Sequence, residues 1–219
     1  GLGNDARALA VHAWGVTRAW LAANPREILT ESQDARFDLL VAHRELGHPV
    51  AYLTGRREFW SREFAVDPAV LIPRPETETL VEAALARMAP DAAVCDLGTG
   101  SGAIAVTLAC ERPAARVVAT DASAGALAVA RSNALRLGAA VDFREGPWYG
   151  PLAGEVFDLI VSNPPYVAGG DAHLARGDLR FEPRGALTDG SDDGLASLRE
   201  IVSGAPAHLK SGGWILIEH

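Results

Sequence analysis

Short apolar runs alternate with helical patterns from residue 76 to the end of the chain, and this alternation limits the possible folds more than any other feature. The apolar runs predict five strands, at Ala92–Asp96, Arg116–Thr120, Val141–Arg144, Phe157–Ser162 and Trp214–Glu218. Helical spacing predicts helices at Glu76–Met88, Ala103–Glu111, Ser123–Leu137 and Leu195–Lys210. Strands that alternate with helices form a parallel sheet covered on both faces, so we predict an α/β domain over residues 73–219.

Residues 1–72 follow a different pattern. Apolar residues at helical spacing predict helices at Ala6–Ala22 and Ser32–Leu46, and hence a small helical domain over residues 1–49. Short β-like pieces follow at Ala51–Leu53, Glu58–Trp60 and Phe64–Val66. These pieces predict a β-hairpin linker over residues 50–72 that joins the two domains.

The composition is that of a globular protein with an acidic second part. Hydrophobic residues make up 48% of the chain, yet no run reaches the roughly 20 apolar residues of a membrane helix, so we expect no membrane partner and a cytoplasmic location. Residues 73–219 carry 12 Lys and Arg against 19 Asp and Glu, which disfavours a stable nucleic-acid partner because phosphate binding needs a basic face. Cys95 and Cys110 stand in apolar surroundings and predict core residues, with neither a disulfide nor a metal site.

A glycine-rich turn joins the first strand of the α/β domain to the helix that follows it. Its residues are Asp96, Leu97, Gly98, Thr99, Gly100, Ser101 and Gly102. Glycines let the backbone turn sharply and let a ligand approach it, beside a helix N-terminus whose amides favour polar or anionic groups. The next strand ends at Asp121, where a carboxylate can accept hydrogen bonds from both hydroxyls of a ribose. The pattern predicts a site for a ligand that contains adenosine.

The neighbours of the glycines distinguish between two such ligands. Gly98, Gly100 and Ala103 satisfy the dinucleotide pattern G-x-G-x-x-G/A, so the glycines alone permit a nicotinamide or flavin cofactor. Asp96 favours S-adenosylmethionine (SAM), because a carboxylate there would hold an ammonium group and repel a pyrophosphate. Trp148 follows the third strand and offers a flat apolar face for adenine, although an ordinary core tryptophan would give the same pattern.

The tetrapeptide Asn163-Pro164-Pro165-Tyr166 follows the fourth strand, at the same carboxyl edge of the sheet as the glycine-rich turn. Its prolines make the loop stiff and extended and leave carbonyls free to accept hydrogen bonds. The Asn163 side-chain oxygen and the Pro164 carbonyl can together accept both N–H bonds of a planar amide or amino group, which would orient its nitrogen for methylation. We therefore predict methyl transfer, with Asn163, Pro164 and Tyr166 as catalytic residues and the whole tetrapeptide, Pro165 included, in contact with the substrate.

The chain resembles the release-factor glutamine methyltransferases, the HemK/PrmC family. The resemblance covers most of its length and rests on Gly47–Gly55, Arg57–Trp60, Leu71–Glu78, Asp96–Ile104, Ser162–Tyr166, Phe181–Arg184 and Gly212–Trp214. It implies a Rossmann-like SAM-dependent methyltransferase domain with a small helical N-terminal domain that docks the substrate protein. It also implies methylation of the glutamine amide in the Gly-Gly-Gln loop of peptide chain release factors, and we expect the enzyme to be a monomer.

Carried over by position, the resemblance implies contacts to SAM from Gly98–Gly102, Asp121, Trp148 and Asn163. Arg74 and Glu76 are expected either to shape the mouth of the substrate site or simply to begin a helix. Pro147 stands where many relatives have an acid, which removes an acceptor for the adenine amino group. 

Two alternatives for the function stay open, and the end of the chain bears on one of them. A sister class that methylates a ribosomal protein shares the tetrapeptide, and so do enzymes that methylate the amino groups of adenine or guanine in nucleic acid. The resemblance implies two further strands beyond His219, so we expect a piece of a longer chain. If the chain were complete as it stands, a protein that binds SAM or a release factor without catalysis would become a competing interpretation.

Overall fold

The computed structural model describes residues 2–26 and 30–219, which fall into two compact units, Gly1–Arg56 and Arg57–His219. In its described residues the first unit consists of helices α1 (Leu2–Trp14), α2 (Arg18–Ala23), α3 (Glu31–Glu45) and α4 (Val50–Thr54). Residues 27–29 of the predicted N-terminal domain lie outside the described residues. The helical character predicted for this part of the chain is confirmed.

The helix predicted over Ala6–Ala22 is two helices. Gly15 adopts a φ of 68°, a left-handed conformation that ends α1. Thr17 then begins α2, because its side chain accepts a hydrogen bond from the Trp20 amide at 3.0 Å. The single-helix prediction is wrong because a glycine and a capping threonine outweigh a continuous apolar spacing.

The strand predicted at residues 51–53 is also wrong, since these residues lie in α4. Gly55 ends this helix in the left-handed conformation, with a φ of 71°, and the Thr54 hydroxyl donates to the Val50 carbonyl at 2.9 Å. A piece of five residues is too short for its apolar spacing to distinguish a strand from one turn of helix.

Strands β1 (Arg56–Phe59) and β2 (Arg62–Ala65) form the predicted hairpin. Its turn consists of Trp60 and Ser61, with φ values of 52° and 54°, whereas the sequence pattern placed Trp60 in a strand. Residues other than glycine rarely adopt this left-handed backbone conformation unless a contact from another part of the protein stabilises it. The support comes from the carboxylate of Glu78, whose Oε1 accepts the Trp60 amide at 2.8 Å.

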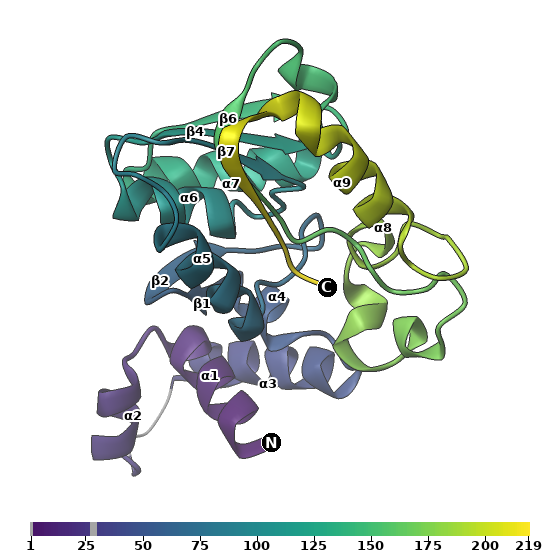
Figure 1. Ribbon diagram of the computed structural model, residues 1–219. Helices are drawn as coiled ribbons and strands as arrows, with labels where there is room; N and C mark the ends of the chain where they lie inside the picture. The colour runs from purple at the N-terminus through teal and green to yellow at the C-terminus, as the bar shows by residue number, and fades with distance from the viewer. Residues whose placement is uncertain (1, 27–29) are drawn as a thin grey trace. The chain divides into compact units, whose positions relative to one another are not determined.

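Among the described residues, five parallel strands form the sheet of the second unit, in the order β5-β4-β3-β6-β7. They are β3 (Ala93–Leu97), β4 (Arg116–Asp121), β5 (Val141–Glu145), β6 (Phe157–Ser162) and β7 (Leu209–Ile217). Figure 1 labels β4, β6 and β7 of this sheet. Each neighbouring pair runs parallel. The α/β fold is confirmed, and four of the five strands lie within one residue of their predicted bounds.

Helices cover both faces of this sheet, because its strands are apolar on both sides. On one face, α5 (Glu78–Leu85), α6 (Ala103–Glu111) and α7 (Ala124–Leu137) contribute to a core with Val94 of β3. On the other, Cys95 and Leu97 of β3 pack with Ile201 of α9 (Ala196–His208). Shorter elements lie in the connections: η1 (Pro75–Thr77), η2 (Gly150–Leu152), η3 (Ala172–Ala175), η4 (Gly177–Phe181) and α8 (Arg184–Leu187).

The last strand is longer than predicted. β7 begins at Leu209, directly after α9, whereas the prediction had a helix to Lys210 and a strand from Trp214. The ladder with β6 is irregular, since Phe157 pairs with Leu209 but Leu159 pairs with Trp214. Glycines in the residues between hid the strand, because a bulge of this kind has the composition of a turn.

The strand order reverses next to β3, and this reversal positions the site. From β3 the chain leads to β4 on one side and later to β6 on the other, so that Leu97 and Ser162 end neighbouring strands. Loops that leave such a switch point in opposite directions open a crevice between them. Within residues 2–26 and 30–219, no helix is long and apolar enough to cross a membrane.

Candidate active site

A cavity of about 590 Å³ lies at the carboxyl ends of β3, β4 and β6, a size typical of sites for small organic ligands. The predicted site residues that line it are Gly98, Thr99, Gly100, Ser101, Asp121, Trp148, Asn163 and Pro165. The other predicted residues, which the described structure places outside the cavity wall, are Asp96, Gly102, Pro164 and Tyr166. One cavity therefore joins the glycine-rich turn to the tetrapeptide.

The glycine loop, residues 98–102, is fixed by backbone hydrogen bonds to the end of the next strand. The amides of Gly98 and Thr99 both donate to the Thr120 carbonyl, at 2.9 and 3.0 Å. Gly100 N donates to Asp121 Oδ2 at 2.8 Å. Because these bonds go to the end of the neighbouring strand, through the Thr120 carbonyl and the Asp121 side chain, the sheet sets the shape of the loop.

Asp121 is held with both oxygens in use. Oδ2 accepts the amide of Gly100 and Oδ1 accepts that of Ser123, each at 2.8 Å. A carboxylate oxygen has two lone pairs, so each oxygen can accept one more hydrogen bond. The carboxylate therefore has a fixed orientation in the cavity and can still bind a pair of hydroxyls.

Asp96 lies beneath the loop and is fully buried. Its Oδ2 accepts the Thr99 hydroxyl at 2.7 Å, whereas Oδ1 is buried with no hydrogen-bond partner in the described part of the chain. Burial raises the pKa of this carboxyl to about 7. Since Asp96 is fully buried and does not line the cavity, its carboxylate can act on a bound ligand only through the loop that covers it.

Trp148 packs against the loop at Gly98. A Cβ atom at Gly98, where φ is +73°, would lie 3.1 Å from Trp148 Cζ3, so the ring and the loop require glycine there. The Thr120 hydroxyl donates to the Trp148 carbonyl at 2.9 Å and supports a φ of 42° at this tryptophan. Trp148 both lines the cavity and packs on the core cluster beside α9, so the two interpretations of this residue are compatible.

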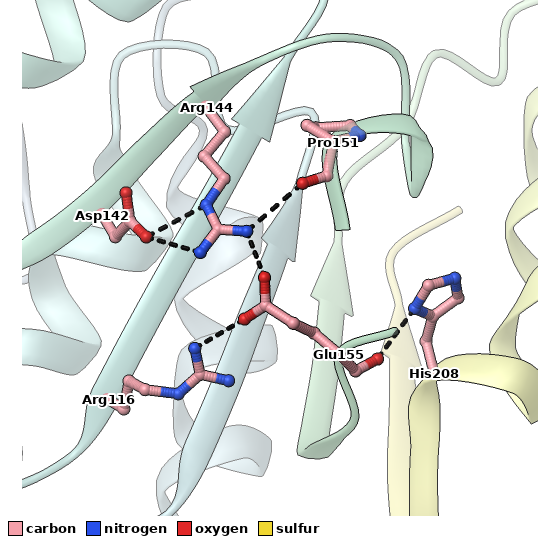
Figure 2. A network of polar contacts seen from close by, with 6 residues as sticks. All are labelled: Arg116, Asp142, Arg144, Pro151, Glu155 and His208. Carbon is pink, nitrogen blue, oxygen red and sulfur yellow. Dashed lines mark hydrogen bonds and ion pairs between the residues drawn. The ribbon is translucent and has the colours of Figure 1, made fainter. Parts of the chain in front are cut away.

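A polar network supports the segment that carries Trp148. Figure 2 draws its members, which are Arg116, Asp142, Arg144, Pro151, Glu155 and His208. Arg144 donates to the Pro151 carbonyl at 3.2 Å and also to Glu155. The hydrogen bond from Arg144 lowers the pKa of the Glu155 carboxyl. The network thus ties β5 to both halves of the connection that leads to β6.

Asn163 follows β6 and is oriented by a residue far away in the sequence. Its Nδ2 donates to the hydroxyl of Thr77 at 3.1 Å, and both residues line the cavity. Among the described residues, none donates to Asn163 Oδ1 or to the Pro164 carbonyl. The arrangement offers acceptors that a planar N–H₂ group requires. Thr77 lies inside the segment Leu71–Glu78 that carries part of the resemblance. A threonine at this position gave no indication in the sequence that it would bind Asn163.

The chain after the tetrapeptide is fixed by residues 187–194. Val167 N donates to the Leu187 carbonyl at 3.0 Å, and Gly169 N donates to the Ser191 carbonyl at 2.8 Å. Gly194 approaches still more closely, since a Cβ there would lie 2.5 Å from the Tyr166 carbonyl oxygen. Tyr166 itself is 40% exposed. The position of the tetrapeptide therefore depends on a segment about 25 residues further along the chain.

Arg74 and Glu76 lie in different places. Arg74 lines the cavity and forms an ion pair of 2.6 Å with Glu182, whose side chain is fully buried and also accepts the Ile72 amide at 3.0 Å. Glu76 lies instead in a separate hollow beside β7. The ion pair joins residues 72–74 to the segment before α8, and only Arg74 of the two predicted residues lies at the cavity.

Asn133 is a further residue that the sequence pattern did not single out. It is fully buried in α7, and its Nδ2 donates to the carbonyls of Ser101, at 2.9 Å, and Ala65, at 3.0 Å. Its Oδ1 accepts the Ala65 amide at 2.7 Å. One side chain thus joins the glycine loop to the hairpin, and an asparagine within an apolar helical face is the signal that could have revealed it.

These residues fit SAM. The cavity wall has an open glycine loop, which suits the methionine part of that molecule. It also has a carboxylate oriented for the ribose hydroxyls and an aromatic face for the adenine. Nothing fills the space where a Cβ of Gly100 would lie, so a ligand can approach the backbone there. Asp96 lies beneath the glycine loop, so its negative charge would favour a cationic group there and disfavour a pyrophosphate.

Two protein-family models match the chain. "PrmC N-terminal domain" matches residues 3–55, and "Methyltransferase small domain" matches residues 75–179. A methyltransferase from Pyrococcus furiosus aligns with a TM-score of 0.54 and 18% identity, over 82% of this chain and 76% of its own, which is a likeness of fold alone.

Curated relatives match the chain over nearly its whole length. The release factor glutamine methyltransferase of Xylella fastidiosa (strain Temecula1) is 56% identical, over 98% of this chain and 79% of the relative. That of Bordetella pertussis is also 56% identical, over 98% of this chain and 80% of the relative. Identity of this degree, over nearly the whole chain, shows the family. The chain belongs to the release factor glutamine methyltransferases, which are SAM-dependent enzymes.

Proposed function

We propose that this enzyme transfers a methyl group from SAM to the side-chain amide nitrogen of the glutamine in the Gly-Gly-Gln loop of a peptide chain release factor. The observation that carries the proposal is the single cavity lined by both the glycine loop and Asn163. The relatives that are 56% identical support the choice of substrate by their names. The enzyme acts as a monomer in the cytoplasm and keeps no stable nucleic-acid partner.

In this proposal the cofactor is held by residues of the glycine loop and its neighbours: Asp96, Gly98, Thr99, Gly100, Ser101, Gly102, Asp121, Trp148 and Asn163. When bound, SAM would supply an electrophilic methyl group and leave as S-adenosyl-L-homocysteine once its sulfur–methyl bond is broken. The Asp121 carboxylate would accept hydrogen bonds from the ribose hydroxyls, and Trp148 would offer its flat face to the adenine. Asp96 would act from beneath the loop, where its negative charge favours the ammonium group.

The reacting amide is held by the tetrapeptide. A carboxamide nitrogen is a poor nucleophile, because its lone pair is delocalised into the carbonyl. Asn163 Oδ1 and the Pro164 carbonyl each accept one of its N–H bonds, which fixes its direction and stabilises positive charge as it develops. Pro165 lines the cavity and keeps the loop extended, and Tyr166 covers the substrate from its exposed position. None of these groups is a strong base, so the amide proton passes to water late in the transfer, or after it.

The helical unit before the hairpin docks the release factor, and the domains are residues 1–49, a linker over 50–72 and the methyltransferase domain over 73–219. The assignment is supported in part by the match of residues 3–55 to a domain of the same family, which carries the helical domain through α4 and beyond residue 49. It predicts that a chain without these helices still binds SAM but methylates the protein substrate poorly.

Incubation with labelled SAM tests the proposed function. Three acceptors are compared in parallel: a release factor, the same factor with its Gly-Gly-Gln glutamine replaced by asparagine, and bulk RNA. We expect label on the unmodified factor alone. Label on RNA, or equal label on the substituted factor, would contradict the proposal.

A further inference from the structure

Thr77 is a buried polar residue that lines the cavity and belongs to neither the proposed cofactor site nor the tetrapeptide. It is 4% exposed, lies 86 residues before Asn163 in the sequence, and accepts the hydrogen bond from Asn163 Nδ2 at 3.1 Å. We propose that Thr77 is a positioning residue, which fixes the Asn163 carboxamide with its oxygen available to the substrate. This inference rests on the proposed function of Asn163.

A carboxamide has two ends of similar shape and opposite hydrogen-bonding character. If the Asn163 group turned over, it would present N–H₂ donors to the N–H₂ donors of the substrate amide, and the two groups would repel each other. The Thr77 hydroxyl occupies the nitrogen end and leaves Oδ1 as the end without an internal partner. In this arrangement Oδ1 can accept from an amide, and the bond to Thr77 resists rotation of the carboxamide away from it.

Thr77 can serve as a fixed point because the chain on either side of it is anchored. On the N-terminal side, Arg74 is paired with buried Glu182 at 2.6 Å, and the Thr77 amide donates to the Arg74 carbonyl at 3.2 Å. On the C-terminal side, Glu78 accepts the amide of Trp60 at 2.8 Å. Because this segment is anchored on both sides, the Thr77 hydroxyl cannot move with the Asn163 carboxamide if that group rotates.

Two substitutions separate positioning from packing. Thr77→Val keeps the branched shape and removes the hydroxyl, while Thr77→Ser keeps the hydroxyl and removes a methyl group. We expect Thr77→Val to lower kcat for release-factor methylation by about tenfold or more, the loss of roughly one oriented hydrogen bond, with KM for SAM unchanged. Thr77→Ser should restore most of the rate. If the valine variant does not fold, Thr77→Ala takes its place.

A double-mutant cycle tests whether Thr77 acts through Asn163. In the Asn163→Ala background, Thr77→Val should lower the residual rate no further. A full additional loss there would show that Thr77 acts by another route and would overturn the inference. So would a wild-type kcat for Thr77→Val in a protein that methylates the release factor.

A readout without turnover separates this inference from the proposed function. The side-chain NH₂ signal of Asn163 in a ¹⁵N NMR spectrum, identified by its loss in Asn163→Ala, should shift in Thr77→Val and stay near its place in Thr77→Ser. If the wild-type enzyme methylates no release factor, the proposed function fails, while the NMR result still decides whether Thr77 holds Asn163. An unshifted signal in Thr77→Val would refute the hydrogen bond itself.

Discussion

The glycine loop and the tetrapeptide leave neighbouring strands at the same edge of the sheet, yet they are held in different ways. The glycine loop bonds to the strand end beside it, through Thr120 and Asp121. The tetrapeptide depends on Thr77, 86 residues earlier, and on Gly194, about 30 residues later. The comparison shows that the part expected to bind the cofactor is held mainly by the end of the neighbouring strand, with Asn133 as a more distant support, whereas the part expected to orient the substrate depends on segments much further away in the sequence.

The largest expected effect comes from the tetrapeptide side. Asn163→Ala removes the acceptor and should lower kcat by about 10²–10³-fold, the cost of losing one oriented group at a reacting centre. Binding of SAM, measured by calorimetry, should weaken far less, since the glycine loop keeps its own support. If Asn163→Ala weakened SAM binding by the same factor as kcat, the glycine loop and the tetrapeptide could not be assigned to cofactor and substrate separately.

Asp96 provides a pH test on the cofactor side. Its pKa of about 7 lies above the ordinary value of 3.8, so the folded protein binds the proton more tightly than the unfolded chain does. The protonated Asp96 carboxyl contributes its full stabilisation of the fold below about pH 4. This contribution is lost as the pH rises through about 7. Asp96→Asn has no such loss, so its unfolding free energy relative to wild type should increase over this range by roughly 3–4 kcal/mol.

Urea unfolding of both proteins at several pH values measures this difference. A difference that stays flat from pH 4 to 8 would refute the raised pKa. Asp96→Asn should also weaken SAM binding but leave kcat at saturating SAM nearly unchanged, in contrast to Asn163→Ala.

Gly194→Ala tests the long-range support of the tetrapeptide. The new Cβ would lie 2.5 Å from the Tyr166 carbonyl, at a φ of +70°, so the loop must move. We expect the free energy of unfolding to fall by about 1–3 kcal/mol and kcat to fall with it. Gly170→Ala is the matched control, because nothing lies within 4 Å of its Cβ and its φ is ordinary. If both variants behaved alike, residues 187–194 would not be what positions the tetrapeptide.

The smallest effect is expected in the network of Figure 2. Glu155→Gln weakens its ion pairs with Arg116 and Arg144, which lie 27–49% exposed. Ion pairs at such positions contribute about 0–1 kcal/mol each, so the melting temperature should change little and KM for SAM less than about threefold. A large rise in KM would mean that the segment carrying Trp148 relies on this network more than on its packing against Gly98.

The sequence predicted what depends on neighbouring residues. Four strands of the sheet, α6 and α7 follow from apolar spacing, and the glycine-rich turn marks its own strand-to-helix junction. Misplaced elements were those in which a few residues compete with the spacing, as Gly15 and Thr17 do in the first helix. The bulge before Trp214 hid half of β7 for the same reason, because its glycines have the composition of a turn.

For the site, the residue types and their places at strand ends determined that a carboxylate, a glycine loop and an Asn-Pro-Pro-Tyr segment would meet at one edge of a parallel sheet. Only the tertiary structure decided which of them line the cavity and what holds them. Thr77, Asn133 and Glu182 act through side-chain hydrogen bonds to residues 32 to 110 positions away. Such bonds leave no periodic trace along the chain, because their geometry exists only after the sheet has brought distant segments together.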